Sequence, residues 1–290
     1  MKKRLLFVAA IFAATATFAQ DGLTSKKGEA YLPEAGDWAI GIDANPFLNY
    51  AGNLFNGNTS NSIGAGATWF MPNTIYGKMF KDEKTAYIGM LRLGFGSSSA
   101  GNNIDTLAGA PAIADEVSIS YNNITLGAGI EKRRGNTRIQ GVYGAMLYIG
   151  FGGGSTKYTY GDVRNDAHTA QWTNWSGTTV TGTSSGNGSR TTEMKNGSTF
   201  DLGILGFLGA EWFFAPKVSL GAKYTWGLAM SSTGESETTT ERFGLTAAEA
   251  ALATPPANHI ITETSKGGKS SSFSLDNGIS GANISLNIHF

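Results

Sequence analysis

The fold is decided by two adjacent stretches, TFDLGILGFLGAEWFF at 199–214 and KVSLGAKYTWGLAMS at 217–231. In both, apolar or aromatic residues occupy nearly every second position, and most of the positions between them hold glycine, charged or small polar residues. A period of two places the apolar residues on one face of a β-strand. Each stretch is about 15 residues long, whereas soluble strands average five or six and a tilted transmembrane strand needs about 9–11. The two stretches therefore predict strands that are long enough to cross a membrane.

The same alternation recurs along the chain and predicts eight strands. They are expected near 37–48, 64–80, 85–97, 117–132, 137–152, 199–214, 217–231 and 272–290. In the fourth strand the apolar phase changes at Asn122 and Asn123, and an extra residue there, as in a β-bulge, would restore the face. Pro72 predicts a bulge or a local break in the second strand, because proline cannot donate a ladder hydrogen bond.

The connections between these strands alternate in length. Short turns are expected at 81–84, 133–136 and 215–216, and long segments at 49–61, 97–116, 153–198 and 231–269. Short turns on one side and long loops on the other are typical of outer-membrane barrels. The predicted fold is an all-β, transmembrane, antiparallel up-and-down β-barrel of eight strands, or of ten if 153–198 contains another membrane hairpin.

Two short helices are expected inside the long segments. Thr246 and Glu249 have the spacing of a capping box and predict a helix near 246–253. A second helix is expected over Phe47–Phe55, where apolar residues recur on one side.

The charged residues within the strands indicate which face meets lipid. A lysine or arginine facing lipid at mid-bilayer costs about 2–4 kcal/mol, so charges in the polar phase must point inward. An eight-stranded barrel is just wide enough for side chains to fill it, and opposite charges inside it are expected to pair as a plug. The candidate lumen charge network comprises Asp43, Lys78, Arg92, Arg138, Asp201, Glu211 and Lys223.

The N-terminus predicts export. A basic start at Lys2–Arg4 precedes the apolar run Leu5–Ala16 and the small-residue site Thr17–Ala19, which is the layout of a cleavable secretory signal. The run is shorter than the roughly 20 residues of a transmembrane helix. We expect a signal peptide at 1–19, a periplasmic tail at 20–36 and an outer-membrane barrel at 37–290.

Two segments and the last residue carry a resemblance. Asp43–Asn58, Asn73–Phe80 and the terminal Phe290 resemble small outer-membrane β-barrel proteins of the Bacteroidetes, with an architecture similar to eight-stranded OmpA/OmpX-type barrels. The resemblance implies that Phe290 is read by the barrel-assembly machinery during insertion. It implies no catalytic residues.

The composition of the chain excludes or disfavours several classes of function. The chain has no cysteine and a formal net charge of zero, which excludes thiolate chemistry and disfavours nucleic-acid binding. No metal or cofactor site is expected, because the three histidines are scattered and calcium-type carboxylate spacing is absent.

The predicted function is a non-enzymatic outer-membrane protein whose loops contact an extracellular or envelope partner or which supports the envelope. Four aromatic residues in 153–198 are candidates for loop binding, although packing of the loop on itself explains them as well: Tyr158, Tyr160, Trp172 and Trp175. The alternatives are a narrow channel and a rim enzyme acting on lipid or peptide through Asp166 and His168, with Ser155 or Ser176 as partners.

Overall fold

The protein is built around a closed ring of eight antiparallel strands. The computed structural model describes residues 24–43, 74–104, 112–166, 168–275 and 281–290. The ring follows the order β1–β2–β3–β4–β5–β8–β9–β13 and closes because β1 pairs with both β2 and β13. The prediction of an all-β antiparallel fold with eight strands in the ring is confirmed.

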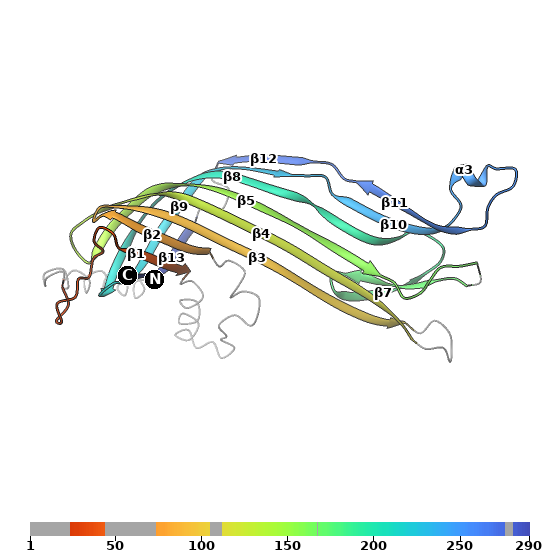
Figure 1. Cartoon of the computed structure of the whole chain (residues 1–290), viewed down its shortest axis with the longest axis horizontal. Helices are drawn as coiled ribbons and strands as arrows, with labels where there is room; N and C mark the ends of the chain where they lie inside the picture. The colour runs from red at the N-terminus through yellow and green to blue at the C-terminus, as the bar shows by residue number, and fades with distance from the viewer. Residues whose placement is uncertain (1–23, 44–73, 105–111, 167, 276–280) are drawn as a thin grey trace, which may run out of the picture.

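The strands of the ring differ greatly in length. They are β1 (Trp38–Asp43), β2 (Thr74–Asp82), β3 (Thr85–Ile104), β4 (Ile113–Arg134), β5 (Ile139–Thr159), β8 (Arg190–Ala215), β9 (Val218–Thr233) and β13 (Gly281–His289). Figure 1 shows β3, β4, β5 and β8 continuing far beyond β1, β2 and β13. We call the end of the ring that carries its three short turns the turn end, and the continuation of the long strands the extension.

The extension is a sheet that does not close. The part of β8 from Thr199 onward pairs with β9, whereas its first part, Arg190–Lys195, pairs with β10 (Glu237–Gly244). Strand β10 also pairs with β11 (His259–Lys266). A separate hairpin of β6 (Gln171–Ser176) and β7 (Thr179–Ser185) lies against the ends of β3 and β4 (Figure 1). β12 (Ser270–Leu275) pairs with the far half of β9.

Segments that were predicted as long loops therefore consist largely of strands. Parts of 97–116, 153–198 and 231–269 continue β3, β4, β5 and β8 or form β6, β7, β10 and β11. They are rich in Ser, Thr, Gly and Asn and lack apolar alternation, so the periodicity of the sequence did not reveal these strands. The hairpin inside 153–198 is not part of the ring, so the ten-strand alternative is wrong.

The predicted bulge at Asn122 and Asn123 is also wrong. The register of β4 with β3 and with β5 runs without interruption across both residues. The same face of β4 is the more buried one in both parts of the strand, and the apolar residues move from that face in the extension to the exposed face in the ring, where Glu131 and Arg133 are the buried residues. Val117 is fully buried and shares its face with Asp115, whose carboxylate accepts the backbone N–H of Thr173 in β6 at 2.7 Å.

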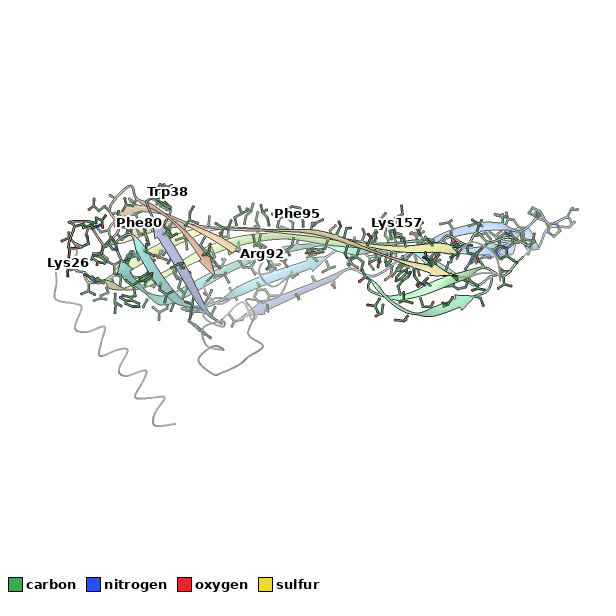
Figure 2. All side chains as sticks on the ribbon, turned by 90° about the horizontal axis from the view of Figure 1, so that it is seen from below. Lys26, Trp38, Phe80, Arg92, Phe95 and Lys157 are labelled. Atoms are coloured by element: carbon green, nitrogen blue, oxygen red, sulfur yellow. The ribbon has the colours of Figure 1, made fainter. Side chains whose placement is uncertain are left out.

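The turn end is compact and is covered by the N-terminal segment. Gly36 donates its backbone N–H to Phe80 at 2.8 Å, and the Arg138 guanidinium lies 3.7 Å from the ring centroid of Tyr31. Lys217 lies in the β8–β9 turn with a positive φ of 57°, and its ammonium pairs with Asp37, which directly precedes β1. Figure 2 labels Trp38 and Phe80 at this end and Lys157 far along the extension.

The helix predicted from the capping box is present but short. α3 spans Ala247–Ala250, and the Thr246 side chain accepts the Glu249 backbone N–H while the Glu249 carboxylate accepts that of Thr246. The capping box holds the pKa of the Glu249 carboxyl below its usual range, mainly through the Thr246 backbone N–H. The expected helix over Phe47–Phe55 and the break at Pro72 lie outside the described residues.

Candidate functional site

The interior of the ring near the turn end is filled by an ionic network. The Lys78 ammonium of β2 bridges two carboxylates, Glu131 of β4 at 3.1 Å and Glu211 of β8 at 2.9 Å. Lys223 of β9 binds the second Glu131 oxygen at 2.5 Å, and the Arg133 guanidinium pairs with Glu211. Both carboxylate side chains are fully buried. Four strands are thereby tied together across the lumen.

Neutral partners complete the coordination of Glu211. Ser219 Oγ and Asn287 Nδ2 donate to its other oxygen at 2.5 and 2.9 Å, and His289 Nε2 lies 3.5 Å from it. Phe80 and Phe213, both buried, flank the Arg133 guanidinium at 5.1 and 5.4 Å from their ring centroids. This layer blocks the turn end of the lumen with paired carboxylates and packed aromatic rings, although Arg133 Nε and Nη1 and His289 Nδ1 are buried without a hydrogen-bond partner among the described residues.

The structure brings three of the predicted lumen residues into this network, namely Lys78, Glu211 and Lys223. Arg92 and Asp201 line the lumen farther from the turn end. Arg138 lies in the β4–β5 turn against Tyr31, and Asp43 is the last residue of β1, paired with Ser285.

Sequence reasoning did not place Glu131 and Arg133 in the network. Both follow Ile130 in the phase opposite to Leu126 and Ile130, which are exposed on the outside of the ring. This inward-facing phase was the feature of the sequence that could have placed Glu131 and Arg133 inside the ring. Arg133 was expected in the turn, but β4 continues through Arg134.

Above the network, toward the extension, the lumen holds a cavity of about 600 Å³. The strand register arranges its walls in rows of residues paired from strand to strand. The row nearest the network runs Ile88, Gly129, Met146, Leu205 and Gly227; the next runs Met90, Gly127, Tyr148, Gly203 and Ala229; the third runs Arg92, Thr125, Gly150, Asp201 and Ser231. On these five strands two rows of apolar residues and glycines thus lie between a polar row and the ionic network, whose Lys78 continues the first row on β2 and lines the cavity with Lys223.

The four candidate loop aromatics lie in and around the hairpin. Tyr158 and Tyr160 stack with ring centroids 6.4 Å apart, and Tyr160 Oη donates to the Thr191 carbonyl at 2.7 Å. Burial raises the pKa of Tyr160 to about 12. The indole N–H of Trp175 is buried and has no hydrogen-bond partner among the described residues.

Two buried arginines bind the hairpin to the sheet. The Arg164 guanidinium lies 4.9 Å from the Trp172 ring centroid, and that of Arg190 lies 4.3 Å from the Tyr160 ring centroid. Arg190 Nε also donates to Glu241 of β10 at 2.7 Å. Tyr160 and Trp172 therefore form part of a local core under the hairpin.

The residues considered for rim catalysis do not form one constellation. His168 Nε2 lies 2.7 Å from Asp162, and Asp166 accepts the Asn258 side-chain amide at 2.8 Å. The Ser155 hydroxyl bonds to Ser120 at 3.0 Å. No group of three or more metal-ligating side chains occurs within the part of the chain that the structure describes.

Comparison with known proteins returns no relative. No family model, no curated protein and no solved structure matches this chain. None of the helices in the described ranges is long and apolar enough to span a membrane.

Proposed function

We propose that this protein spans the outer membrane as a plugged, non-conducting and non-enzymatic barrel that holds a long β-sheet outside the cell. The observation that carries the proposal is the reversed polarity of the ring. Large apolar side chains are exposed on its outside, whereas Lys78, Glu131, Arg133 and Glu211 are buried inside. A soluble barrel has the opposite distribution, because water outside favours polar groups there.

The exposed apolar surface has the height of a bilayer. On β5 it runs from Ile139 to Phe151, and the 12 steps between these residues span about 40 Å at the rise of an antiparallel strand. At the tilt of about 40° that is usual in barrels, this length spans about 30 Å, close to the hydrocarbon thickness.

Aromatic side chains border this surface at both ends, as the interfacial girdles of membrane barrels do. Trp212 pairs with Ile139 near the turn end, where Trp38 stacks on Phe290 at 4.7 Å between centroids. Phe151 and Phe200 pair at the other border, with centroids 5.4 Å apart.

The location of the turn end follows from this assignment. Short turns face the periplasm in bacterial barrels and long connections face outward, so the extension stands outside the cell. The ionic layer at the turn end supports a closed lumen, since ion passage there would require breaking buried salt bridges. The resemblance to small Bacteroidetes barrels agrees with this assignment, and it makes Phe290 the residue presented to the assembly machinery.

A pair of matched substitutions tests the membrane assignment. Leu147 on the outside of the ring and Leu252 just after α3 are exposed to similar extents, 51% and 55%. In lipid vesicles, Leu147→Arg is expected to lose about 2–4 kcal/mol of unfolding free energy, and Leu252→Arg close to none. The readouts are denaturant unfolding and the gel-mobility shift of unboiled samples. Equal effects of the two substitutions would contradict the proposal.

Fractionation and conductance complete the test. The full-length protein should sediment with outer membranes and migrate faster when unboiled. Planar bilayers containing it should show no discrete conductance steps. Regular steps would favour the narrow channel instead.

A further inference from the structure

We propose that the cavity in the ring is a binding chamber for a single-chain amphiphile, whose alkyl chain lies along the two apolar rows and whose polar head lies at the row of Arg92 and Asp201. The ligand class is an alkyl chain with one small polar head, which a fatty acid and a lysophospholipid share. The proposal rests on the membrane location for its supply of ligand, and on the cavity for its recognition.

The two rows are unusual for the lumen of a membrane barrel. Interior positions are normally polar, because they face water or a polar plug. Here five adjacent strands contribute two successive rows of lumen residues without a charged side chain. Met146, Leu205 and Tyr148 are buried and packed together, with Ile88 and Met90 against them.

These apolar residues do not fill the space that they surround. Glycines alternate with the large side chains. Gly127 lies under the ends of Met90 and Met146, each 3.1 Å from where a Cβ would stand, and Gly203 lies under the ring of Tyr148. A cavity of about 600 Å³ remains, well within the range of small-molecule sites. Protein interiors normally leave few voids larger than a water molecule, so a packed core does not explain it.

Along its axis the chamber changes from apolar to polar, which matches the alkyl chain and the polar head of an amphiphile. Beyond the apolar rows, one continuous row carries Arg92, Thr125, Asp201 and Ser231. Ser272 of β12 continues it, paired with Ser231. A head group held there has donors and acceptors from five strands. Methionine is well suited to the alkyl part, because its flexible thioether adapts to chains of varied shape.

Methionine methyl groups report binding directly. The protein carries Met90 and Met146 in the chamber and Met79 on the outside of the ring, 55% exposed. We would label the methionine methyl groups with ¹³C, place the full chain in nanodiscs of deuterated long-chain phospholipid and titrate decanoate or decanoyl-lysophosphocholine. Met90 and Met146 should shift saturably at one ligand per protein. Met79 should shift only in proportion to the amphiphile dissolved in the bilayer.

Two variants with the same chemical change separate the chamber from the outside. Ala229→Phe fills the second apolar row and should weaken binding at least tenfold. Ala145→Phe, at an exposed position on the outside of β5, should leave it unchanged. Saturation by either or both amphiphiles supports the proposal and identifies the preferred head. Absence of saturable shifts at Met90 and Met146 with both amphiphiles overturns it, as does wild-type affinity in Ala229→Phe.

The same samples distinguish the two proposals. The gel-mobility shift of unboiled protein reports whether the barrel has inserted and folded. Loss of that shift in the wild type would count against the membrane assignment. A folded, inserted barrel without saturable binding would count against the chamber alone. If Ala229→Phe does not fold, the wild-type titration still decides.

Discussion

Replacing Glu211 by alanine is expected to cost this protein about 3–5 kcal/mol of unfolding free energy. That is the usual cost of removing one partner from a buried ion pair, because the remaining charge stays buried. Glu211 binds both Lys78 and Arg133. Without it Lys78 keeps Glu131 at 3.1 Å, but the nearest remaining carboxylate to Arg133 is Glu131 at 4.0 Å. The cost is determined by the Arg133 guanidinium, which stays fully buried and has lost its closest carboxylate.

The assay is guanidinium unfolding of the reconstituted barrel followed by tryptophan fluorescence. With a slope of about 4 kcal/mol per molar, the midpoint of Glu211→Ala should fall by about 1 M. Glu193→Ala is the control, because Glu193 pairs with Lys195 at 3.4 Å on the exposed extension and should cost less than about 1 kcal/mol. Adding Arg133→Met to Glu211→Ala should recover part of the loss, since the two charges belong to one unit. Equal midpoints for the two alanine variants would refute the reasoning.

Three further outcomes are expected. Burial raises the pKa of the Asp37 carboxyl, but its hydrogen bond from Lys217 and the Glu34 backbone N–H outweigh burial and hold it below the usual range. A lowered pKa stabilises the fold above the unfolded value of about 3.9 and loses that effect as the pH falls through the folded value, so Asp37→Asn should be less stable than wild type at pH 7, with a gap in denaturation midpoint that closes under acid. Gly144→Ala should destabilise the ring by about 1–3 kcal/mol, because its Cβ would overlap the Ile130 carbonyl, whereas Gly77→Ala, with nothing within 4 Å, should not; urea midpoints of the two variants decide this. Phe290→Ala should insert more slowly in cells while refolding normally in vesicles, which pulse-labelling of the folded band would measure; equal insertion rates would remove the assembly role of Phe290.

The strands of the ring were predictable because each keeps an apolar face on the same side along its length in the ring. Between Phe200 and Phe214 one face of β8 is almost wholly apolar, and most of the charged residues and glycines lie on the other face, so the period of two is visible in the sequence. Periodicity gave a wrong prediction where a strand passes from the ring into the extension. At Asn122 the apolar phase of β4 switches, and local sequence does not distinguish an inserted residue from a change in which face, buried or exposed, carries the apolar residues.

Periodicity also failed to predict strands in the extension. Strand β8 begins at Arg190, nine positions before the predicted start at 199. Residues 190–198 are mostly polar and carry no alternation. Their strand conformation comes from pairing with β5 and β10, which are distant in sequence.

The sequence by itself determined that the chain forms long antiparallel strands and that most of their charged positions lie on the face opposite to exposed aromatic residues such as Trp212 and Tyr224, because both follow from local periodicity. That eight strands close the ring was decided by the pairing of distant strands. Only the tertiary structure decided which charges meet. Lys78 and Glu211 are 133 positions apart, and Lys223 and Glu131 are 92 apart. Their contacts depend on ring closure and on the stagger of every register between them. The same stagger aligns Met90, Tyr148 and Ala229 into one row and leaves the chamber open beside them.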